Sequence, residues 1–407
     1  MKMQEFRGNI EKYLNYLMIG YAFVLPLSRA GMIAIAGLML LLALFDYALK
    51  EKIALIKKDY VSLAILGFIL FNTLSLVWVS SENLFNAIRY VSKYWYFLPI
   101  FVFFTSLKSE NLYRVISAFI LGMFVSEIIS YGIFFEIWEF KHGTPDNPSP
   151  FMHHIEYSIF LAFTALLLLN RIFNEGEWKF KLFYSLFFIT ILGNLFLTNG
   201  RTGQIAFMIG LIVLGFMSFK NKFKAFLVSI VLLSTIVGTA YTFSNTFHQR
   251  VAIGKEDIVK VIENKNYCSS WGARLGFWVI ASDIFVENPI LGVGIKDNMR
   301  EFHSLVEQKY PEMDCITYLP HFHNQYLQIV TATGLVGLFI FLFMIYQILK
   351  IKLTVKRYYN IKMIFLSLFL FGFVSEPLLH AQFSMLFFSL IVGILLAQSR
   401  FENEVQH

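Results

Sequence analysis

Two histidines stand where a long polar stretch, residues 244–324, meets an apolar run that begins at Gln325. An imidazole can take up or release a proton near neutral pH. His323 lies next to the expected N-terminus of a helix, whose dipole disfavours the imidazolium and so favours the neutral, proton-accepting form. We predict His323 as a catalytic acid or base, with His321 and Asn324 in support. The alternative is an interfacial pair hydrogen-bonded to loop carbonyls.

Two arginines are candidate anion ligands. Arg201 stands in Asn199-Gly200-Arg201-Thr202-Gly203, at the start of an apolar helix, where free N–H groups and a forked guanidinium together suit phosphate oxygens. Arg274 stands early in a second expected helix, within Gly272-Ala273-Arg274-Leu275. The alternatives are an Arg201 that reaches lipid headgroups and an Arg274 that is a surface charge or pairs with Asp283 or a nearby glutamate.

Other polar residues fall inside or at the rims of apolar runs, where they are costly and often functional. Arg89 and Lys93 are four residues apart, so they face one way on a helix and are further candidates for a supporting role. Ion pairing within the bundle is the alternative for most of this group, which also includes Glu127, Glu136, Glu156, Glu376 and His380.

Motifs for a metal or a nucleotide are missing from the sequence. The seven aspartates form no Asp-x-Asp pair, and neither a phosphate-binding Gly-x4-Gly-Lys loop nor a His-Glu-x-x-His helix occurs. His-x-His alone is a weak metal signal. We therefore expect no metal and no cofactor.

The composition shows what must position these side chains. The 407 residues are 57% hydrophobic and only 15% charged, with a mean hydropathy of +0.62, which excludes an ordinary soluble protein. The net charge of +7 sits in short clusters between apolar runs, as in a membrane protein, so no nucleic-acid partner is expected. We predict an all-α polytopic membrane protein in contact with membrane lipids.

Twelve windows are long and apolar enough to cross a membrane. They divide the chain into helices 1–9 (residues 1–243), a large outer loop (244–324), and helices 10–12 with a tail (325–407). The first run is followed directly by another, so no cleavable signal is expected. The windows lie near residues 13–28, 31–49, 60–80, 84–106, 112–138, 153–171, 181–198, 202–219, 224–243, 325–349, 361–379 and 382–398.

Lysine and arginine give the expected orientation. With the N-terminus inside, the inner segments hold 21 of them, whereas the short outer loops hold three, Arg29, Lys141 and Arg201. Cytoplasmic loops carry the excess of positive residues. Both termini are therefore expected in the cytoplasm and the loop of residues 244–324 outside.

The outer loop is expected to fold. Helical spacing is present over residues 255–265, 271–285 and 298–310. Cys268 and Cys315, the two cysteines of the chain, both lie in this loop. A disulfide between them would close 46 intervening residues and stabilise the loop by about 3 to 4 kcal/mol. Two unpaired thiols are the alternative.

Taken together, these motifs resemble the O-antigen ligase family of bacterial inner-membrane glycosyltransferases, whose superfamily also holds O-antigen polymerases and O-linked oligosaccharyltransferases. The resemblance rests on four stretches: the Asn199–Gly203 and Gly272–Leu275 motifs, Pro289-Ile290-Leu291-Gly292-Val293-Gly294, and His323-Asn324-Gln325-Tyr326-Leu327 with Thr333-Gly334-Leu335-Val336-Gly337 behind it.

The resemblance implies a GT-C-like fold and transfer of a glycan from undecaprenyl diphosphate to the lipid A core at the periplasmic face of a Gram-negative inner membrane. It also implies that Arg201 and Arg274 bind the diphosphate and that His323 activates the acceptor, without metal. The residues support this chemistry, since guanidiniums can stabilise a departing diphosphate and a neutral histidine can take a proton.

Four alternatives to the ligase stay open. A polymerase or an oligosaccharyltransferase would share the motifs, whereas a transporter or flippase of lipid-linked saccharides predicts an internal repeat that the sequence does not show. A structural subunit of the envelope would leave the histidines replaceable.

Overall fold

A computed structural model describes residues 9–140, 142–174 and 176–406. Lys141, one of the three outer cations counted above, lies outside these residues. The described chain is helical and contains no strand beyond an isolated bridge between Thr144 and Asn147. The predicted all-α class is confirmed.

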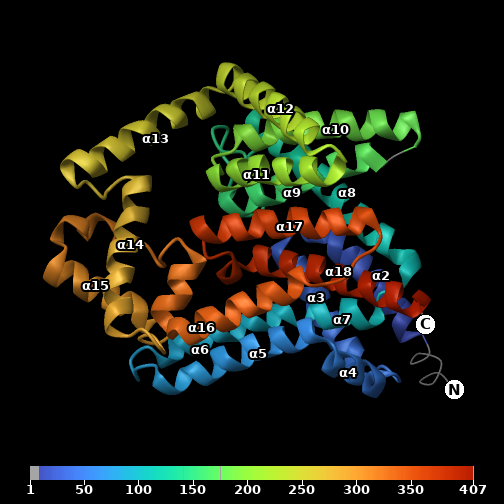
Figure 1. The fold of residues 1–407 in the computed structure, drawn as a ribbon, viewed down its shortest axis with the longest axis horizontal. Helices are drawn as coiled ribbons and strands as arrows, with labels where there is room; N and C mark the ends of the chain where they lie inside the picture. The colour runs from blue at the N-terminus through green and yellow to red at the C-terminus, as the bar shows by residue number, and fades with distance from the viewer. Residues whose placement is uncertain (1–8, 141, 175, 407) are drawn as a thin grey trace.

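Helices of the N-terminal part form most of the bundle in Figure 1. They are α2 (Ile10–Val24), α3 (Arg29–Leu44), α4 (Leu49–Lys58), α5 (Tyr60–Leu74) with the 3₁₀ turn η1 (Ser75–Trp78), α6 (Leu84–Ser92), η2 (Lys93–Phe97), α7 (Pro99–Ser106), α8 (Ser109–Phe134), α9 (His154–Asn174), α10 (Trp178–Leu197), α11 (Arg201–Ser218) and α12 (Lys222–Phe243).

The rest of the chain supplies a cap and three further bundle helices. The cap, defined as residues 245–316, lies at one end of the molecule in Figure 1, and the chain termini lie at the other. Its elements are α13 (Asn245–Asn264), α14 (Ser270–Glu287), α15 (Asp297–Lys309) and η3 (Pro311–Ile316), and they are followed by α16 (Gln325–Leu349), α17 (Lys356–Ser375), η4 (Leu378–His380) and α18 (Gln382–Gln406).

Nine helices of the described chain are long and apolar enough to span a membrane, or up to ten if the bent pair α3 and α4 counts as one span. They correspond to nine of the twelve predicted windows. The windows 13–28 and 31–49 contain α2 and α3, which are helical but only 15 and 16 residues long.

The window 84–106 was expected as one helix, and this is wrong. The structure divides it into α6, the 3₁₀ segment η2 and α7. Pro99 occupies the first turn of α7, and a proline there cannot donate the backbone hydrogen bond that a continuous helix would need. Arg89 and Lys93 therefore lie at the end of α6 and the start of η2.

Helix α18 forms the centre of the bundle, and 94% of its apolar window is buried, against 11% for α12. The ring of Phe387 on α18 contacts Phe119 of α8, Phe160 of α9 and Phe369 of α17, with ring centroids 5.3, 4.5 and 5.9 Å apart. These aromatic contacts pack α8, α9 and α17 against α18. Helix α17, whose C-terminal end leads into the site described below, is thereby held against α18.

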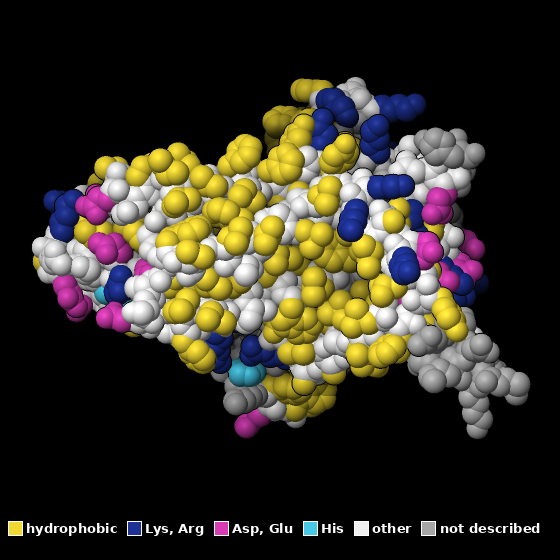
Figure 2. Space-filling view, turned by 90° about the horizontal axis from the view of Figure 1, so that it is seen from below, with side chains coloured by type: hydrophobic (Ala, Val, Ile, Leu, Met, Phe, Trp, Pro, Cys, Tyr) yellow, Lys and Arg dark blue, Asp and Glu magenta, His cyan; other side chains and the backbone are white. Residues whose placement is uncertain are grey.

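Apolar side chains cover the middle of the face seen in Figure 2, between charged residues at the cap end and a concentration of lysine and arginine toward the opposite end. This is the surface expected of a protein that spans a bilayer.

The cap contains the expected helices, although α13 begins at residue 245 rather than 255. A disulfide joins Cys268 and Cys315, whose Cα atoms are 5.5 Å apart. It ties the start of α14 to η3. Phe277 and Phe302 form the centre of the cap's own apolar core.

A kink in α16 brings the backbone of the cap into direct contact with the bundle. Gly334 has φ +63°, and a Cβ there would lie 2.2 Å from the carbonyl oxygen of Ile290. At this point Val293 N–H donates to Thr331 O, and Leu335 N–H donates to Pro289 O. The two glycine-containing motifs are therefore bonded to each other, which fixes α14 relative to α16.

Candidate functional site

The turn before α16 positions the two histidines. The Asn324 side chain caps the helix by accepting hydrogen bonds from the N–H groups of Tyr326 and Leu327, at 2.8 and 3.1 Å. Its amide nitrogen donates to Val374 O of α17. His323 has φ +45°, a strained backbone conformation for a non-glycine residue, which brings its ring back beside that of His321.

A carboxylate not assigned to the site from the sequence joins both rings. Glu376 Oε2 lies 2.8 Å from His323 Nδ1, and Glu376 Oε1 lies 3.3 Å from His321 Nε2. All three side chains are largely buried, with 21%, 15% and 13% of the His323, His321 and Glu376 side chains exposed. We call these three residues the His–Glu cluster.

Hydrogen bonds assign the tautomer of His321. Its Nδ1 accepts from the backbone N–H of His323 at 3.3 Å, so the proton belongs on Nε2, which faces Glu376. Burial is the main cause that lowers the pKa of His321 to about 4. His321 is therefore neutral at physiological pH.

His323 has one occupied and one free ring nitrogen. Its Nδ1 faces Glu376, whereas its Nε2 is buried and has no hydrogen-bond partner among the described residues. A proton on Nδ1, donated to the carboxylate, leaves a lone pair on Nε2. This lone pair has no partner within the described chain and is available to accept a proton.

Glu376 stays ionised in this position. Burial alone would raise its pKa, but the hydrogen bond from His323 and the nearby positive charges, including Arg274, bring the pKa below its ordinary value. Helix α17 ends just before Glu376 because Pro377 follows, and the residue before a proline favours an extended backbone. A carboxylate here can stabilise an imidazolium that forms on His323.

Arg201 is placed by the glycines around it. A Cβ on Gly200 or Gly203 would lie 2.1 or 2.2 Å from atoms of Ser158, so α11 can approach α9 only with glycine at these positions. Beside Arg201, the Thr202 hydroxyl accepts from Ser375, the residue before Glu376. The N-terminus of α11 thus lies against the end of α17.

The guanidinium of Arg201 is unsatisfied. Its Nε and Nη1 are buried and have no hydrogen-bond partner in the described part of the chain. A buried, unpaired guanidinium is costly, and an anionic ligand would supply the missing acceptors.

Arg274 lies in α14 and donates from Nη1 to the carbonyl and hydroxyl oxygens of Ser270. The alternative pairing with Asp283 is wrong, because that carboxylate binds Lys309 Nζ at 2.7 Å and the Tyr310 hydroxyl at 2.8 Å. Burial lowers the pKa of Arg274, while the charges of Glu376 and Arg201 act on it in opposite directions. The structure thus brings Arg201, Arg274 and the His–Glu cluster together.

Arg89 and Lys93 do share a face, as predicted, but they line a different cavity of about 580 Å³ together with Tyr90 and His380. The ring of His380 lies 6.3 Å from that of His321. The two cations are therefore neighbours of the His–Glu cluster and make no direct contact with it.

The His–Glu cluster also offers donor atoms for a metal ion. One ligand atom from each of His321, His323 and Glu376 lies within 4.8 Å of the others, and imidazole nitrogen with carboxylate oxygen suits zinc. As arranged, each carboxylate oxygen already faces one ring nitrogen, which is a complete hydrogen-bonded unit for proton transfer. Activity in the presence of a chelator distinguishes a metal site from a site for proton transfer.

The fold and site define a multi-pass membrane protein in which histidine, glutamate and arginine side chains gather where the cap joins the bundle. Residues 186–342 match the O-antigen ligase family. This segment is therefore similar to the O-antigen ligase family, and the predicted resemblance is confirmed. It is also 26% identical over 300 residues to an uncharacterized protein of Haemophilus influenzae, covering 71% of each chain.

The matched segment contains Arg201, Arg274, His321 and His323 but ends before Glu376. Sequence reasoning singled out Glu376 only as one of several acids near the membrane. Its position directly after an apolar helix, at the same end of the bundle as the histidines, was the available signal. The pairing itself depends on how α16 and α17 pack.

Proposed function

We propose that the protein is an O-antigen ligase, which transfers a glycan from undecaprenyl diphosphate to the lipid A core oligosaccharide. The observation that supports this most directly is the His323–Glu376 contact of 2.8 Å, with His323 Nε2 free, next to Arg201 and Arg274. A base and two anion ligands are what transfer from a diphosphate to a hydroxyl requires.

In the proposed reaction, His323 Nε2 takes the proton of the acceptor hydroxyl while the oxygen attacks the anomeric carbon of the donor sugar. The bond from that carbon to the diphosphate oxygen breaks, and the charge passes to the diphosphate. Arg201 and Arg274 stabilise that charge. Glu376 holds the His323 ring in place and stabilises the imidazolium, as the carboxylate does in other histidine-based sites. No step uses a metal.

We also propose that the cap faces the periplasm and that both termini are cytoplasmic in a Gram-negative inner membrane. The predominance of lysine and arginine in the segments assigned to the termini side supports this orientation. It puts the His–Glu cluster on the side where ATP is absent and where a diphosphate-linked donor must supply the driving force.

An O-antigen polymerase is the second candidate, because the same base and arginines would serve an acceptor that is itself carried on a lipid. The matched family segment covers the donor arginines and the base, which both activities need. The two differ in the product and can be separated by it.

Purified protein with undecaprenyl-diphosphate glycan, lipid A core and a chelator tests the proposal. We expect glycan on lipid A core in the wild type and none with His323→Ala or Arg201→Ala. Glycan that lengthens on the lipid carrier would identify a polymerase. Loss of wild-type transfer on chelation, with recovery on adding zinc, would instead make the His–Glu cluster a metal site.

A further inference from the structure

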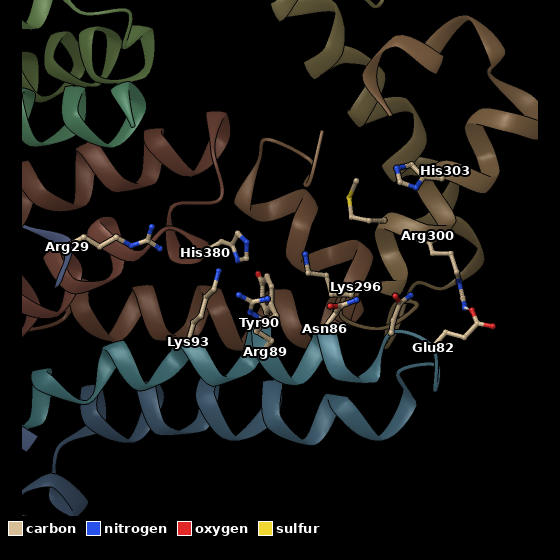
Figure 3. A pocket seen from close by; sticks show the side chains of 12 residues that line it. Arg29, Glu82, Asn86, Arg89, Tyr90, Lys93, Lys296, Arg300, His303 and His380 are labelled. Atoms are coloured by element: carbon tan, nitrogen blue, oxygen red, sulfur yellow. Dashed lines mark hydrogen bonds and ion pairs between the residues drawn. The ribbon is translucent and has the colours of Figure 1, made fainter. Parts of the chain in front are cut away.

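A second cluster of charged side chains surrounds a cavity of about 580 Å³ between η4, α6 and the beginning of α15 (Figure 3). This volume is in the range of small-molecule sites. Neither Arg201 nor Arg274 is among its lining residues. We call it the cationic cavity, after the basic residues that line it: Arg29, Arg89, Lys93, Lys296 and Arg300.

The cationic cavity contains more positive charge than the protein neutralises. Glu82 is its one acidic lining residue, and it pairs with Arg300 at 3.3 Å. Arg29, Lys93 and Lys296 make no ion pair within the described chain, and Figure 3 shows them extending into the space around His380. Unpaired cations held together repel one another unless an anion is bound.

A further acid near these cations, Glu156, is already hydrogen-bonded. Glu156 lines a neighbouring cavity of about 530 Å³, which shares Arg29, Lys93 and His380 with the cationic cavity. Its Oε1 accepts hydrogen bonds from the backbone N–H and the hydroxyl of Ser384. The shared residues make the two cavities adjacent, with room for a ligand larger than a single anion.

The walls of the cationic cavity are held rigidly. Asp297, 3% exposed, accepts hydrogen bonds from Ser80 N–H, the Ser80 hydroxyl and the Asn83 amide, which ties the start of α15 to the loop before α6. Lys296, at φ +74°, places its ammonium 5.6 Å from the centre of the Tyr90 ring. Tyr90 in turn stacks on His380, with centroids 4.6 Å apart. This is a preformed site and not a set of mobile surface lysines.

His380 links this cavity to the His–Glu cluster. Burial, together with the charges of Lys93 and Lys296, lowers the pKa of His380 to about 3, so its ring is neutral. Its ring centroid is 6.3 Å from that of His321. A ligand in the cationic cavity would therefore reach the His–Glu cluster beside His321.

We propose that the cationic cavity binds phosphate groups of the acceptor glycan and so holds the acceptor hydroxyl near His323. This rests on the proposed transferase function, because it concerns the second substrate of that reaction. The donor diphosphate has its own unsatisfied ligands on Arg201. The cap supplies Lys296, Met299 and His303 to the walls, so the cavity lies between cap and bundle, where a hydrophilic glycan fits.

Equilibrium binding tests this without any transfer step. The probes are lipid A core in phosphatidylcholine nanodiscs and the same lipid after its phosphates are removed with hydrofluoric acid. Full-length wild type is compared with Lys93→Gln and Lys296→Gln, each of which removes one charge. Lys255→Gln, an exposed cap position that does not line the cavity, is the matched control.

We expect each cavity variant to bind the phosphorylated lipid about tenfold more weakly, the size of one lost charge-assisted hydrogen bond. The control should bind as the wild type does, the dephosphorylated lipid should bind weakly to all, and undecaprenyl-diphosphate glycan should bind all equally. Arg89→Gln replaces any variant that fails to give a monodisperse protein.

Unchanged affinity of folded Lys93→Gln and Lys296→Gln for the phosphorylated lipid would overturn the proposal. Competition by phosphatidylglycerol nanodiscs for the binding of lipid A core to the wild type would also overturn it. The cavity would then be a site for phospholipid headgroups. The transfer assay is independent of these results: a protein that binds the acceptor through these lysines but forms no product would keep this inference and lose the ligase assignment.

Discussion

At the scale of single residues, the proton has one route through His323. Nδ1 is held by Glu376 at 2.8 Å, so only Nε2 can accept a proton from a substrate. The positive φ of His323 is unfavourable in itself and persists because Asn324 and Glu376 fix the residues around it. Such strain is common where side-chain direction matters more than local stability.

Arg201→Ala is expected to lower kcat/KM for the donor by about 10²- to 10³-fold, because two charge-assisted hydrogen bonds to the diphosphate are lost. Arg201→Lys should recover part of this, since an ammonium keeps the charge but lacks the fork. Steady-state kinetics with varied donor measures both. Arg357→Ala, an exposed arginine at the start of α17, serves as the control and should change neither constant.

Acid should destabilise the site through its histidines. His321 has a folded-state pKa of about 4, below its ordinary value of 6.5, so the unfolded chain binds protons more readily between these values. Stability is therefore expected to fall as pH drops from 6.5 toward 4. His380, with a pKa of about 3, acts in the same direction.

The corresponding measurement is the melting temperature at pH values from 7 down to 4.5. Glu376 stays ionised over this interval, because its pKa is below its ordinary value. His321→Gln should reduce the decrease, because one of the histidines whose pKa is lowered by burial is removed. His248→Gln, at an exposed position of α13, should leave the decrease unchanged. If the melting temperature changes with pH equally in wild type and His321→Gln, His321 does not contribute to the loss of stability in acid.

Local sequence was enough to nominate His323, Arg201 and Arg274, because each stands at a helix N-terminus or early in a helix, where its surroundings are set by neighbours in the chain. It was not enough for Glu376. That residue is 53 positions from His323, and its partner is chosen by the packing of α16 against α17. Long-range pairing of this kind leaves no periodic signal.

At the scale of elements, the kink of α16 positions the turn that carries His321 and His323. Helix α14 carries Arg274, and the segment after it is bonded to Thr331 and Leu335 on the two sides of Gly334. Because α16 begins directly after the histidines, the same contact fixes α14, which carries Arg274, relative to the turn that carries His323.

Gly334→Ala should destabilise the protein by about 2 to 4 kcal/mol and lower transfer. The new methyl group would meet the Ile290 carbonyl at 2.2 Å, and φ +63° is itself unfavourable for alanine. Gly37→Ala is the control, because a Cβ on Gly37 in α3 has no atom within 4 Å. A melting temperature for Gly334→Ala equal to that of Gly37→Ala would contradict the role of the kink.

Long apolar runs predicted most of the helices, since 18 or more apolar residues favour a spanning helix over any alternative. The prediction was wrong where polar positions and Pro99 interrupt the run at 84–106, because hydropathy averages over such breaks. The short helix α4, charged and without buried residues, gave no apolar signal at all.

At the scale of the whole molecule, the cap lies at one end and the termini lie at the other (Figure 1). The two histidines of the His–Glu cluster lie in the turn that joins the cap to α16. The proposed use of a diphosphate-linked donor requires that the cap faces the periplasm.

Single introduced cysteines test the orientation. In intact cells, a membrane-impermeant maleimide that enters the periplasm should modify Lys255→Cys in the cap and spare Lys352→Cys, which lies in the exposed turn between α16 and α17. Lys352→Cys should react only after the inner membrane is permeabilised. The reverse pattern would place the cap in the cytoplasm and would contradict the proposed transfer from a diphosphate-linked donor in the periplasm.

The central claim is that Glu376 makes His323 a base for the acceptor, and Glu376→Gln tests it most directly. The neutral amide can still accept a hydrogen bond from His323 but cannot stabilise an imidazolium. In the reconstituted reaction we expect kcat to fall at least a hundredfold, with the donor KM unchanged within twofold and the melting profile close to that of wild type. A folded Glu376→Gln protein with wild-type kcat would contradict the account.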